Sequence, residues 1–141
     1  MRVAITHNPA CGTSRNVLKL LQEGGHDVEV IPYLDTGWTR AQLTMMFAAA
    51  GVTPRQALRT SKSPAEELGL LDEGVSDEAL IDAMLAHPVL VNRPFVATPK
   101  GTKLCRPSGE ALDLIDPWPP APFAKEDGSL LINAAGERMP E

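Results

Sequence analysis

The chain has little cysteine, no long apolar run and no excess of positive charge. Its two cysteines, Cys11 and Cys105, are too few for a disulfide framework. The longest stretch without a charged residue, 41–54, has 14 residues, whereas a membrane-spanning helix needs about 20. The 13 basic residues are outnumbered by 18 acidic ones, giving a net charge of −5. We therefore expect neither nucleic acid nor a membrane as a partner, because both favour a basic surface.

The composition is that of an ordinary globular protein. The chain has 141 residues, of which 43% are hydrophobic and 22% charged, enough for one domain with its own core. The N-terminal apolar run turns polar by His7, too soon for a signal peptide. We therefore expect the protein to be cytoplasmic, where cysteines are usually reduced thiols.

The order of apolar segments predicts an α/β fold. Arg2–Thr6 is a β-branched run, residues 14–23 have helical periodicity ended by Gly24 and Gly25, and 27–33 is a second strand. A strand, a helix and a strand in this order form a parallel βαβ unit. Further on, Phe95–Thr98 and 102–106 flank a turn and predict an antiparallel hairpin.

Between these parts lies a segment, at about 39–87, that we expect to be a helical insertion. It contains three residues suited to cap a helix N-terminus: Thr39, Ser63 and Ser76. We expect 1–115 to form a single domain that includes this insertion. Residues 116–141 form a proline-rich C-terminal extension, for which a small hairpin and a loose tail are both open.

The strongest functional signal is the loop at 7–15, His-Asn-Pro-Ala-Cys-Gly-Thr-Ser-Arg. It places Cys11 between the first strand and the first helix, where backbone N–H groups and the helix dipole favour a thiolate. His7, Ser14 and Arg15 flank this sulfur and could activate it by hydrogen bonding or charge. The alternative is that Cys11 is a small buried hydrophobic residue at a strand end.

Spacing excludes two related kinds of thiol site. A dithiol redox pair would need cysteine at position 14, which is Ser14. A phosphatase loop of the Cys-x5-Arg type would need arginine at position 17, which is Val17. The loop therefore offers one nucleophilic thiol, and a redox cycle would need electrons from an external thiol.

Three arginines form a second candidate set: Arg59, Arg93 and Arg106. Guanidinium groups bind tetrahedral oxyanions in bidentate fashion and remain charged, so these residues are candidate substrate ligands. The alternative is that they form ion pairs with nearby acids. Cys105 fits a packed strand residue, with a resolving thiol as the other interpretation. The histidines show no ligand spacing with the cysteines, so we expect no metal site.

Five motifs in order resemble the glutaredoxin-coupled arsenate reductase family. They are residues 7–15, the Glu-Leu-Gly-Leu run at 67–70, His-Pro at 87–88, Asn-Arg-Pro at 92–94 and Gly-Thr-Lys-Leu-Cys-Arg-Pro at 101–107. The match runs from residue 3 to about 115, and the extension resembles that of the longer members. The resemblance implies a thioredoxin-like fold, a mixed sheet with a helical insertion.

The resemblance also implies a reaction, the reduction of arsenate to arsenite. Cys11 would attack arsenate, glutathione would add to the adduct as co-substrate, and glutaredoxin would resolve it, with no bound cofactor. Arg59, Arg93 and Arg106 would bind the oxyanion, while His7 and Ser14 would tune the thiolate. The Arg93–Pro94 peptide bond would be cis.

Two alternative functions stay open at this point. One is a glutathione-dependent reductase of the same fold with another substrate. The other is a non-catalytic regulator that binds RNA polymerase, although such proteins usually have a second cysteine where this chain has Ser14.

Overall fold

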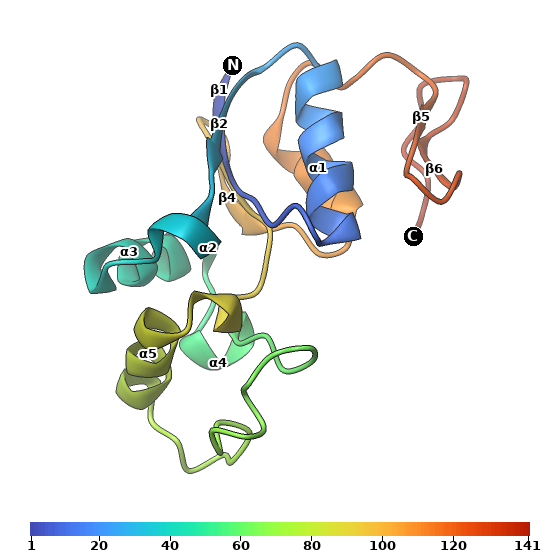
Figure 1. Cartoon of the computed structure of the whole chain (residues 1–141). Coiled ribbons are helices and arrows are strands. Elements are labelled where there is room, and N and C mark those ends of the chain that lie inside the picture. Colours follow the sequence, from blue (N-terminus) through green and yellow to red (C-terminus); the bar gives the residue numbers. More distant parts are fainter. The chain divides into compact units, whose positions relative to one another are not determined.

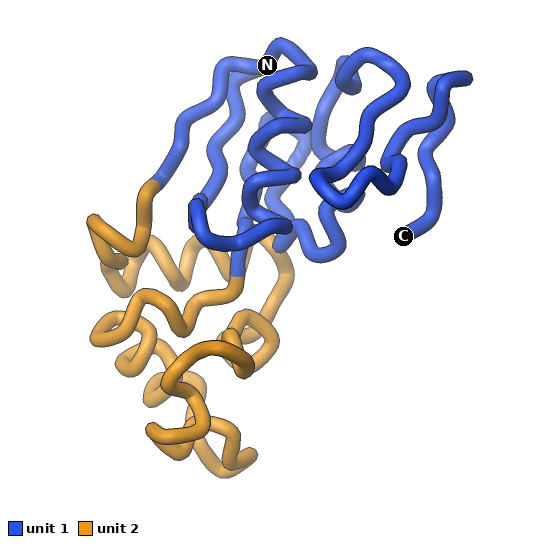
Figure 2. Tube along the Cα trace, turned by 45° about the vertical axis from the view of Figure 1, so that its right-hand side comes forward, with its two compact units in different colours: residues 1–31, 93–141 blue, residues 32–92 orange.

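The computed structural model describes residues 1–141, which form two compact units (Figure 2). Unit 1 consists of Met1–Ile31 with Arg93–Glu141, and unit 2 is Pro32–Asn92. No helix in either unit is long and apolar enough to cross a membrane. The segment between the βαβ unit and the hairpin is thus a unit of its own, and the C-terminal extension belongs to unit 1.

Unit 1 is built on a four-stranded mixed sheet with the order β2-β1-β3-β4 (Figure 1). The central strand β1 (Arg2–Thr6) runs parallel to β2 (Asp27–Ile31) and antiparallel to β3 (Phe95–Thr98). Strand β4 (Gly101–Leu104) pairs antiparallel with β3. The parallel pair needs a crossover, which helix α1 (Gly12–Glu23) provides. The expected βαβ unit and hairpin are both confirmed.

The core of unit 1 lies between this sheet and two helical segments, α1 and the 3-10 helix η2 (Ser108–Leu114). Helix α1 turns its apolar stripe to the core, and complete burial of each such side chain contributes about 1.5–3 kcal/mol. The core residues on the strands and α1 include Val3, Ile5, Val17, Leu20, Leu21 and Val96. This packing fixes the direction in which the N-terminus of α1 points.

The C-terminal extension is folded onto unit 1. Strands β5 (Phe123–Ala124) and β6 (Leu130–Ile132) form a hairpin, one of the two outcomes left open by the sequence. Phe123 and Leu131 belong to the buried core, and the Lys19 ammonium lies 5.2 Å from the centre of the Phe123 ring. The hairpin is therefore held against α1 by apolar burial and a cation–π contact.

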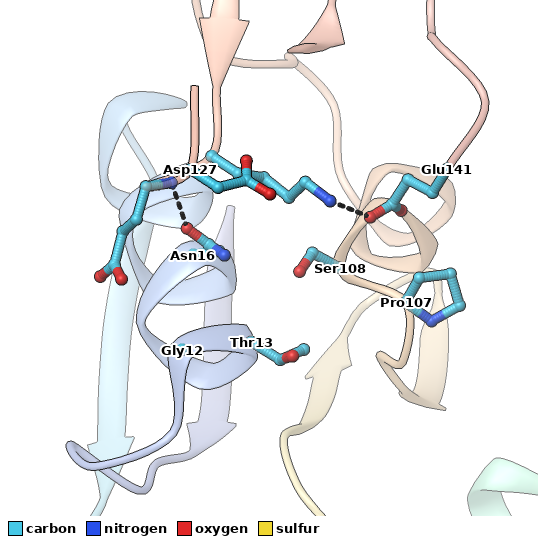
Figure 3. Close-up of a pocket in the computed structure, with 9 residues that line it drawn as sticks. Gly12, Thr13, Asn16, Pro107, Ser108, Asp127 and Glu141 are labelled. Atoms are coloured by element: carbon cyan, nitrogen blue, oxygen red, sulfur yellow. Dashed lines mark hydrogen bonds and ion pairs between the residues drawn. The ribbon is translucent and has the colours of Figure 1, made fainter. Parts of the chain in front are cut away.

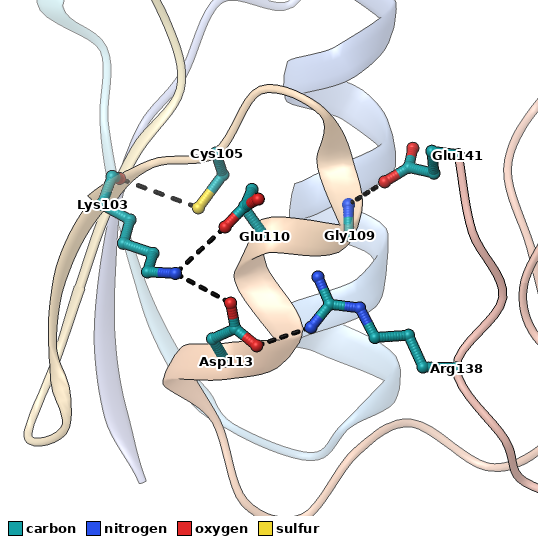
Figure 4. Close-up of polar contacts among 7 residues, drawn as sticks. All are labelled: Lys103, Cys105, Gly109, Glu110, Asp113, Arg138 and Glu141. Carbon is teal, nitrogen blue, oxygen red and sulfur yellow. Dashed lines mark hydrogen bonds and ion pairs between the residues drawn. The ribbon is translucent and has the colours of Figure 1, made fainter.

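Ion pairs also tie the extension to unit 1 (Figure 4). Asp113, on η2, accepts hydrogen bonds from Arg138 Nη1 at 2.5 Å and from Lys103 Nζ at 2.8 Å. Lys103 also donates to Glu110 at 3.0 Å. These side chains are 36–41% exposed, so the network contributes little stability and mainly fixes the path of the chain.

Unit 2 is helical, as expected for the insertion. Its segments are α2 (Tyr33–Thr36), α3 (Arg40–Ala50), α4 (Pro54–Ala57), α5 (Asp77–Ala86) and the 3-10 helix η1 (Pro88–Leu90). Thr39 and Gln42 form the capping box at the start of α3, and the Ser76 hydroxyl accepts from Ala79 N at the start of α5. Both predicted caps are confirmed.

The helix predicted after Ser63 is wrong. The segment from Pro64 makes a single turn, closed by a hydrogen bond from Leu68 N to Pro64 O of 3.0 Å. Gly69 then adopts a positive φ of 70°, which ends the helical path. The Ser63 hydroxyl donates to the Arg59 carbonyl at 2.5 Å and therefore serves the preceding turn as well. The capping signal at Ser63 therefore marks a turn, because Gly69 follows before a longer helix can form.

Candidate active site

Asn8 shapes the loop that carries Cys11. Its side-chain Oδ1 accepts from Ala10 N at 2.9 Å, and its carbonyl accepts from Cys11 N at 3.0 Å. This turn ends β1 and leaves Cys11 as the N-cap residue of α1, with extended φ and ψ of −97° and 119°. No role for Asn8 was predicted, although an Asn-Pro pair after a strand is a turn signal.

The Cys11 side chain is buried, with 6% of the residue exposed, yet the pKa of its thiol is lowered from its ordinary value. Burial by itself raises this pKa because it disfavours the charged form. The N–H of Ser14, the charge and hydrogen bond of Arg93, and the hydrogen bond of Arg106 outweigh that effect. These neighbours favour the thiolate form, as at reactive cysteines, whereas a purely apolar role would not call for them.

Two of the three candidate arginines lie at this sulfur. Arg106 Nη1 is 3.7 Å from Cys11 Sγ and donates to the Arg93 carbonyl at 3.1 Å. The Arg93 side chain is itself buried, and its guanidinium acts on the Cys11 thiolate. The Arg93–Pro94 bond is cis, as the resemblance implies. Two fixed guanidinium groups beside one sulfur can offset the charge of an oxyanion that approaches a thiolate.

His7 and Ser14 contact each other. The Ser14 hydroxyl lies 2.7 Å from His7 Nδ1 and accepts from Asn8 N at 3.1 Å. The hydroxyl is therefore engaged within the loop, and it is the backbone N–H of Ser14 that acts on Cys11. Burial, followed by the charge of Arg15, lowers the pKa of His7. His7 is thus neutral at pH 7 and supplies hydrogen bonding but no positive charge.

Arg15 is exposed and points to the C-terminal extension. Its Nε and Nη2 donate to the two carboxylate oxygens of Glu126 at 2.8 and 3.0 Å, and Nη1 donates to Pro9 O at 2.8 Å. Glu126 raises the pKa of Arg15 most, and Cys11 adds a smaller increase. The groups that lower the pKa of Cys11 are Ser14, Arg93 and Arg106, so activation of the thiolate by Arg15 stays a prediction.

Arg59 belongs to unit 2, whereas Cys11, Arg93 and Arg106 belong to unit 1. Within unit 2 it follows the short helix α4. Its backbone N–H donates to Leu90 O at 2.8 Å, and its Nε donates to Ser61 O at 3.1 Å. These bonds fix the backbone at Arg59 inside its own unit, and its part in oxyanion binding remains a prediction.

Cys105 is enclosed in the core just after β4 (Figure 4). None of its surface is exposed, and its sulfur lies 3.7 Å from the Lys103 carbonyl. Burial, with smaller effects of Glu110 and Asp113, raises its pKa to about 12. The packed interpretation therefore fits, and the thiol lacks the ionisation that a resolving cysteine needs. No three His, Cys, Asp or Glu side chains of the chain are grouped so that they could hold a metal ion.

Comparison with known proteins places this arrangement in a family. The ArsC family matches residues 6–114, a span that includes Cys11 and all three candidate arginines. The arsenate reductase ArsI2 of Synechocystis sp. is 58% identical over 137 residues, covering 97% of this chain and 98% of its own. The arsenate reductase of Escherichia coli strain K12 is 45% identical over 137 residues, or 97% of each chain.

A solved structure agrees with the sequence relatives. The arsenate reductase from Vibrio cholerae aligns with a TM-score of 0.77 and 35% identity, covering 82% of this chain and 98% of its own. The expected thioredoxin-like α/β fold is thereby confirmed. With a match over most of its length and over the loop that holds its activated sulfur, the chain belongs to the ArsC family.

Proposed function

We propose that this protein reduces arsenate to arsenite, with Cys11 as the nucleophile. The observation that carries the proposal is the buried Cys11 sulfur, whose lowered pKa arises from Arg93, Arg106 and a helix N–H despite desolvation. Relatives named arsenate reductase match almost the whole chain and support the choice of substrate.

The first step joins two anions, so it needs positive charge. The Cys11 thiolate attacks arsenic, a sulfur–arsenic bond forms, and one arsenic–oxygen bond breaks as that oxygen leaves as water after protonation. Arg93 and Arg106 bind the remaining oxygens and stabilise the charge that builds up on them. We assign Arg59 to the same oxyanion on the strength of the family resemblance. His7 and Ser14 position the loop, and Arg15 adds a partly compensated charge.

The second step needs two electrons, because arsenic passes from the +5 to the +3 state. Cys105 cannot supply them, since it is sealed in the core with a pKa of about 12. We infer that glutathione forms a second sulfur–arsenic bond as a second arsenic–oxygen bond breaks and that oxygen, once protonated, leaves as water. A glutaredoxin thiolate then attacks the glutathione sulfur, and the bond between this sulfur and arsenic breaks with its electron pair left on arsenic. The two oxidised sulfurs leave as a mixed disulfide of glutaredoxin and glutathione. Water releases arsenite and returns the Cys11 thiol.

The test is turnover of purified protein with arsenate, glutathione and glutaredoxin, followed as arsenite formed. We expect arsenite production to require all three components. Alkylation of Cys11 alone should abolish it. Arsenite formation with thioredoxin in place of glutathione and glutaredoxin would contradict the proposed electron donors. No turnover of arsenate with any thiol donor would contradict the substrate and favour another reductase of this fold.

Co-purification with RNA polymerase distinguishes the proposed reductase from the non-catalytic regulator. A reductase should not co-purify with RNA polymerase in stoichiometric amounts, whereas stable co-purification without arsenate turnover would favour the regulator.

A further inference from the structure

A pocket of about 360 Å3 lies in unit 1 beside the N-terminus of α1 (Figure 3). Gly12, Thr13 and Asn16 of α1 form one wall, and Ser108 at the start of η2 forms another. The rest comes from the C-terminal extension, including Asp127. The lining begins at Gly12, one residue after Cys11, and Cys11 itself does not line the pocket. None of the residues that line it is used by the first reaction step.

Ser108 presents its hydroxyl to this pocket. The residue is only 3% exposed, and its Oγ makes no hydrogen bond to another group of the chain. Figure 3 shows the side chain directed into the space above Thr13. A hydroxyl that faces a pocket and is not engaged within the chain can donate to a polar group of a ligand.

Three carboxylates line the pocket; two of them form ion pairs, and the third, Asp127, is affected by the charge of Lys125 without an ion pair to it. The Glu126 carboxylate is paired with Arg15, and Glu141 accepts from Lys125 Nζ at 3.1 Å. Asp127 forms no ion pair, and its two hydrogen bonds, from Ser129 N and Oγ, both go to Oδ1. Its Oδ2 is therefore available to a ligand cation.

We propose that this pocket binds the γ-glutamyl end of glutathione, with the ammonium at Asp127 and the α-carboxylate at the hydroxyls of Ser108 and Thr13. The inference rests on the proposed function, because it assigns a place to the thiol used there. A paired ammonium and carboxylate fit a pocket with a free carboxylate beside hydroxyl donors. The glycyl end of glutathione has a carboxylate alone, which the acidic extension would repel.

The distances suit the reaction. Among the lining residues of α1, Asn16 is the farthest from Cys11 in the chain. It lies five residues after Cys11, or about 7.5 Å along the helix at 1.5 Å per residue. The glutathione thiol lies eight bonds from the γ-glutamyl ammonium, or about 10 Å when extended. A γ-glutamyl group held in the pocket therefore leaves its thiol within reach of an adduct on Cys11.

The first experiment compares glutathione with its two dipeptide fragments in the arsenate assay with wild-type protein. γ-Glutamylcysteine keeps the group that the pocket binds, whereas cysteinylglycine lacks it. We expect KM for γ-glutamylcysteine to stay within about threefold of that for glutathione, and KM for cysteinylglycine to rise about tenfold or more, as when a hydrogen bond to a charged group is lost. Equal KM values for the two fragments would overturn the proposal.

The second experiment changes the pocket. Asp127→Asn keeps Oδ1 for the Ser129 bonds and removes the charge, and Ser108→Ala removes only the hydroxyl. We expect KM for glutathione to rise about tenfold in each, with KM for arsenate changed less than twofold. Matched controls are Asp35→Asn and Ser61→Ala, at exposed positions of unit 2. Unchanged KM for glutathione in both pocket variants would contradict the site.

A binding measurement separates this inference from the proposed function. S-methylglutathione cannot react, so its NMR titration into the wild-type protein reports the pocket alone. We expect the amide signals of Thr13, Asn16 and Ser108 to shift, and the shifts to vanish in Asp127→Asn. Arsenate turnover without these shifts would contradict the glutathione pocket and leave the proposed reaction standing. Shifts without arsenate turnover would contradict the proposed reaction and leave the pocket standing.

Discussion

Two regions of unit 1, the loop before α1 and the end of β4, each bury one cysteine. They shift the pKa of its thiol in opposite directions. Cys11 is 6% exposed and Cys105 is fully enclosed, so desolvation raises the pKa of both thiols. Around Cys11 a backbone N–H and two guanidinium groups reverse that effect. Around Cys105 the carboxylates of Glu110 and Asp113 add to it, although Lys103 opposes them.

The contrast shows that exposure does not decide which thiol reacts. What differs is whether charged or hydrogen-bonding donors face the sulfur, and this depends on where the chain turns. Cys11 is an N-cap residue, at the end of a helix where N–H groups are unpaired. Cys105 follows β4 and belongs to the core cluster, where its thiol faces the Lys103 carbonyl, an acceptor.

Removal of each sulfur gives the largest expected difference. Cys11→Ser should lower arsenate turnover by at least about 10⁴-fold, since a hydroxyl has neither the nucleophilicity nor the pKa of the thiol. Cys105→Ser should retain turnover within a few-fold, because its sulfur takes no part in the reaction. Both variants are assayed with glutathione and glutaredoxin.

The folded state of Cys105→Ser must be checked first, because a hydroxyl in the core is unfavourable without a partner. Cys105→Ala, which adds no polar atom, is the matched control. If turnover disappears in the alanine variant while its circular dichroism spectrum is native, the two cysteines act together and the comparison is wrong.

Alkylation of the native protein should separate the thiols by on the order of a thousandfold or more in rate at pH 7.5. Cys11 has a lowered pKa, so its rate should fall only when pH drops through that lowered value. Cys105, with a pKa of about 12, should react only after unfolding. Iodoacetamide labelling followed by mass spectrometry reads both sites at once. A Cys11 midpoint near 8.5 would mean that the arginines do not activate it.

The same shifts predict opposite effects of pH on stability. Ionised Cys11 stabilises the folded state above the ordinary thiol pKa, and this contribution is lost as pH falls through the lowered folded value. Cys105 must remain protonated in the folded state, so its contribution is present at neutral pH and is lost as pH rises from about 9 towards 12. Urea unfolding of Cys105→Ala should therefore lack the decline at high pH.

Changing a guanidinium should have an intermediate effect. Arg106→Lys removes the planar group whose Nη1 atom contacts both Cys11 Sγ and the Arg93 carbonyl. We expect turnover to fall about 10- to 100-fold and the pKa of Cys11 to rise, because a lysine cannot bind in bidentate fashion. Arg2→Lys, at an exposed position on β1, is the control. Equal activity of the two variants would exclude Arg106 from the site.

The sequence predicted the parts of the molecule that depend on local pattern. Periodicity and capping residues, which are read over short stretches of the chain, predicted four features of the fold. These are the βαβ unit, the hairpin and the caps at Thr39 and Ser76. The helix after Ser63 failed because a local signal was overruled by the glycine that follows it.

The sequence could not predict contacts between distant segments. Glu126 meets Arg15 across 111 positions, and Ser108 faces Thr13 in a pocket made from both ends of unit 1. Such pairs have no spacing rule, since they depend on how η2 and the extension pack. Arg93 and Arg106 were candidates from the chemistry of the guanidinium group and from the resemblance, and their approach to one sulfur became visible only in the folded chain.

The smallest expected effect concerns Arg15, for which the sequence predicted activation of Cys11. Glu126→Gln breaks the bidentate ion pair but leaves the bond from Arg15 Nη1 to Pro9 O, so the guanidinium stays in place. Both side chains are close to half-exposed, so the urea midpoint should not change measurably. The positive charge of Arg15 then lacks its compensating carboxylate, and the pKa of Cys11 should fall slightly further. The measurement is the pH profile of alkylation at low salt, repeated at high salt, which should cancel the difference. A rise in the pKa of Cys11 would show that Glu126 holds Arg15 in its activating position and does not oppose it.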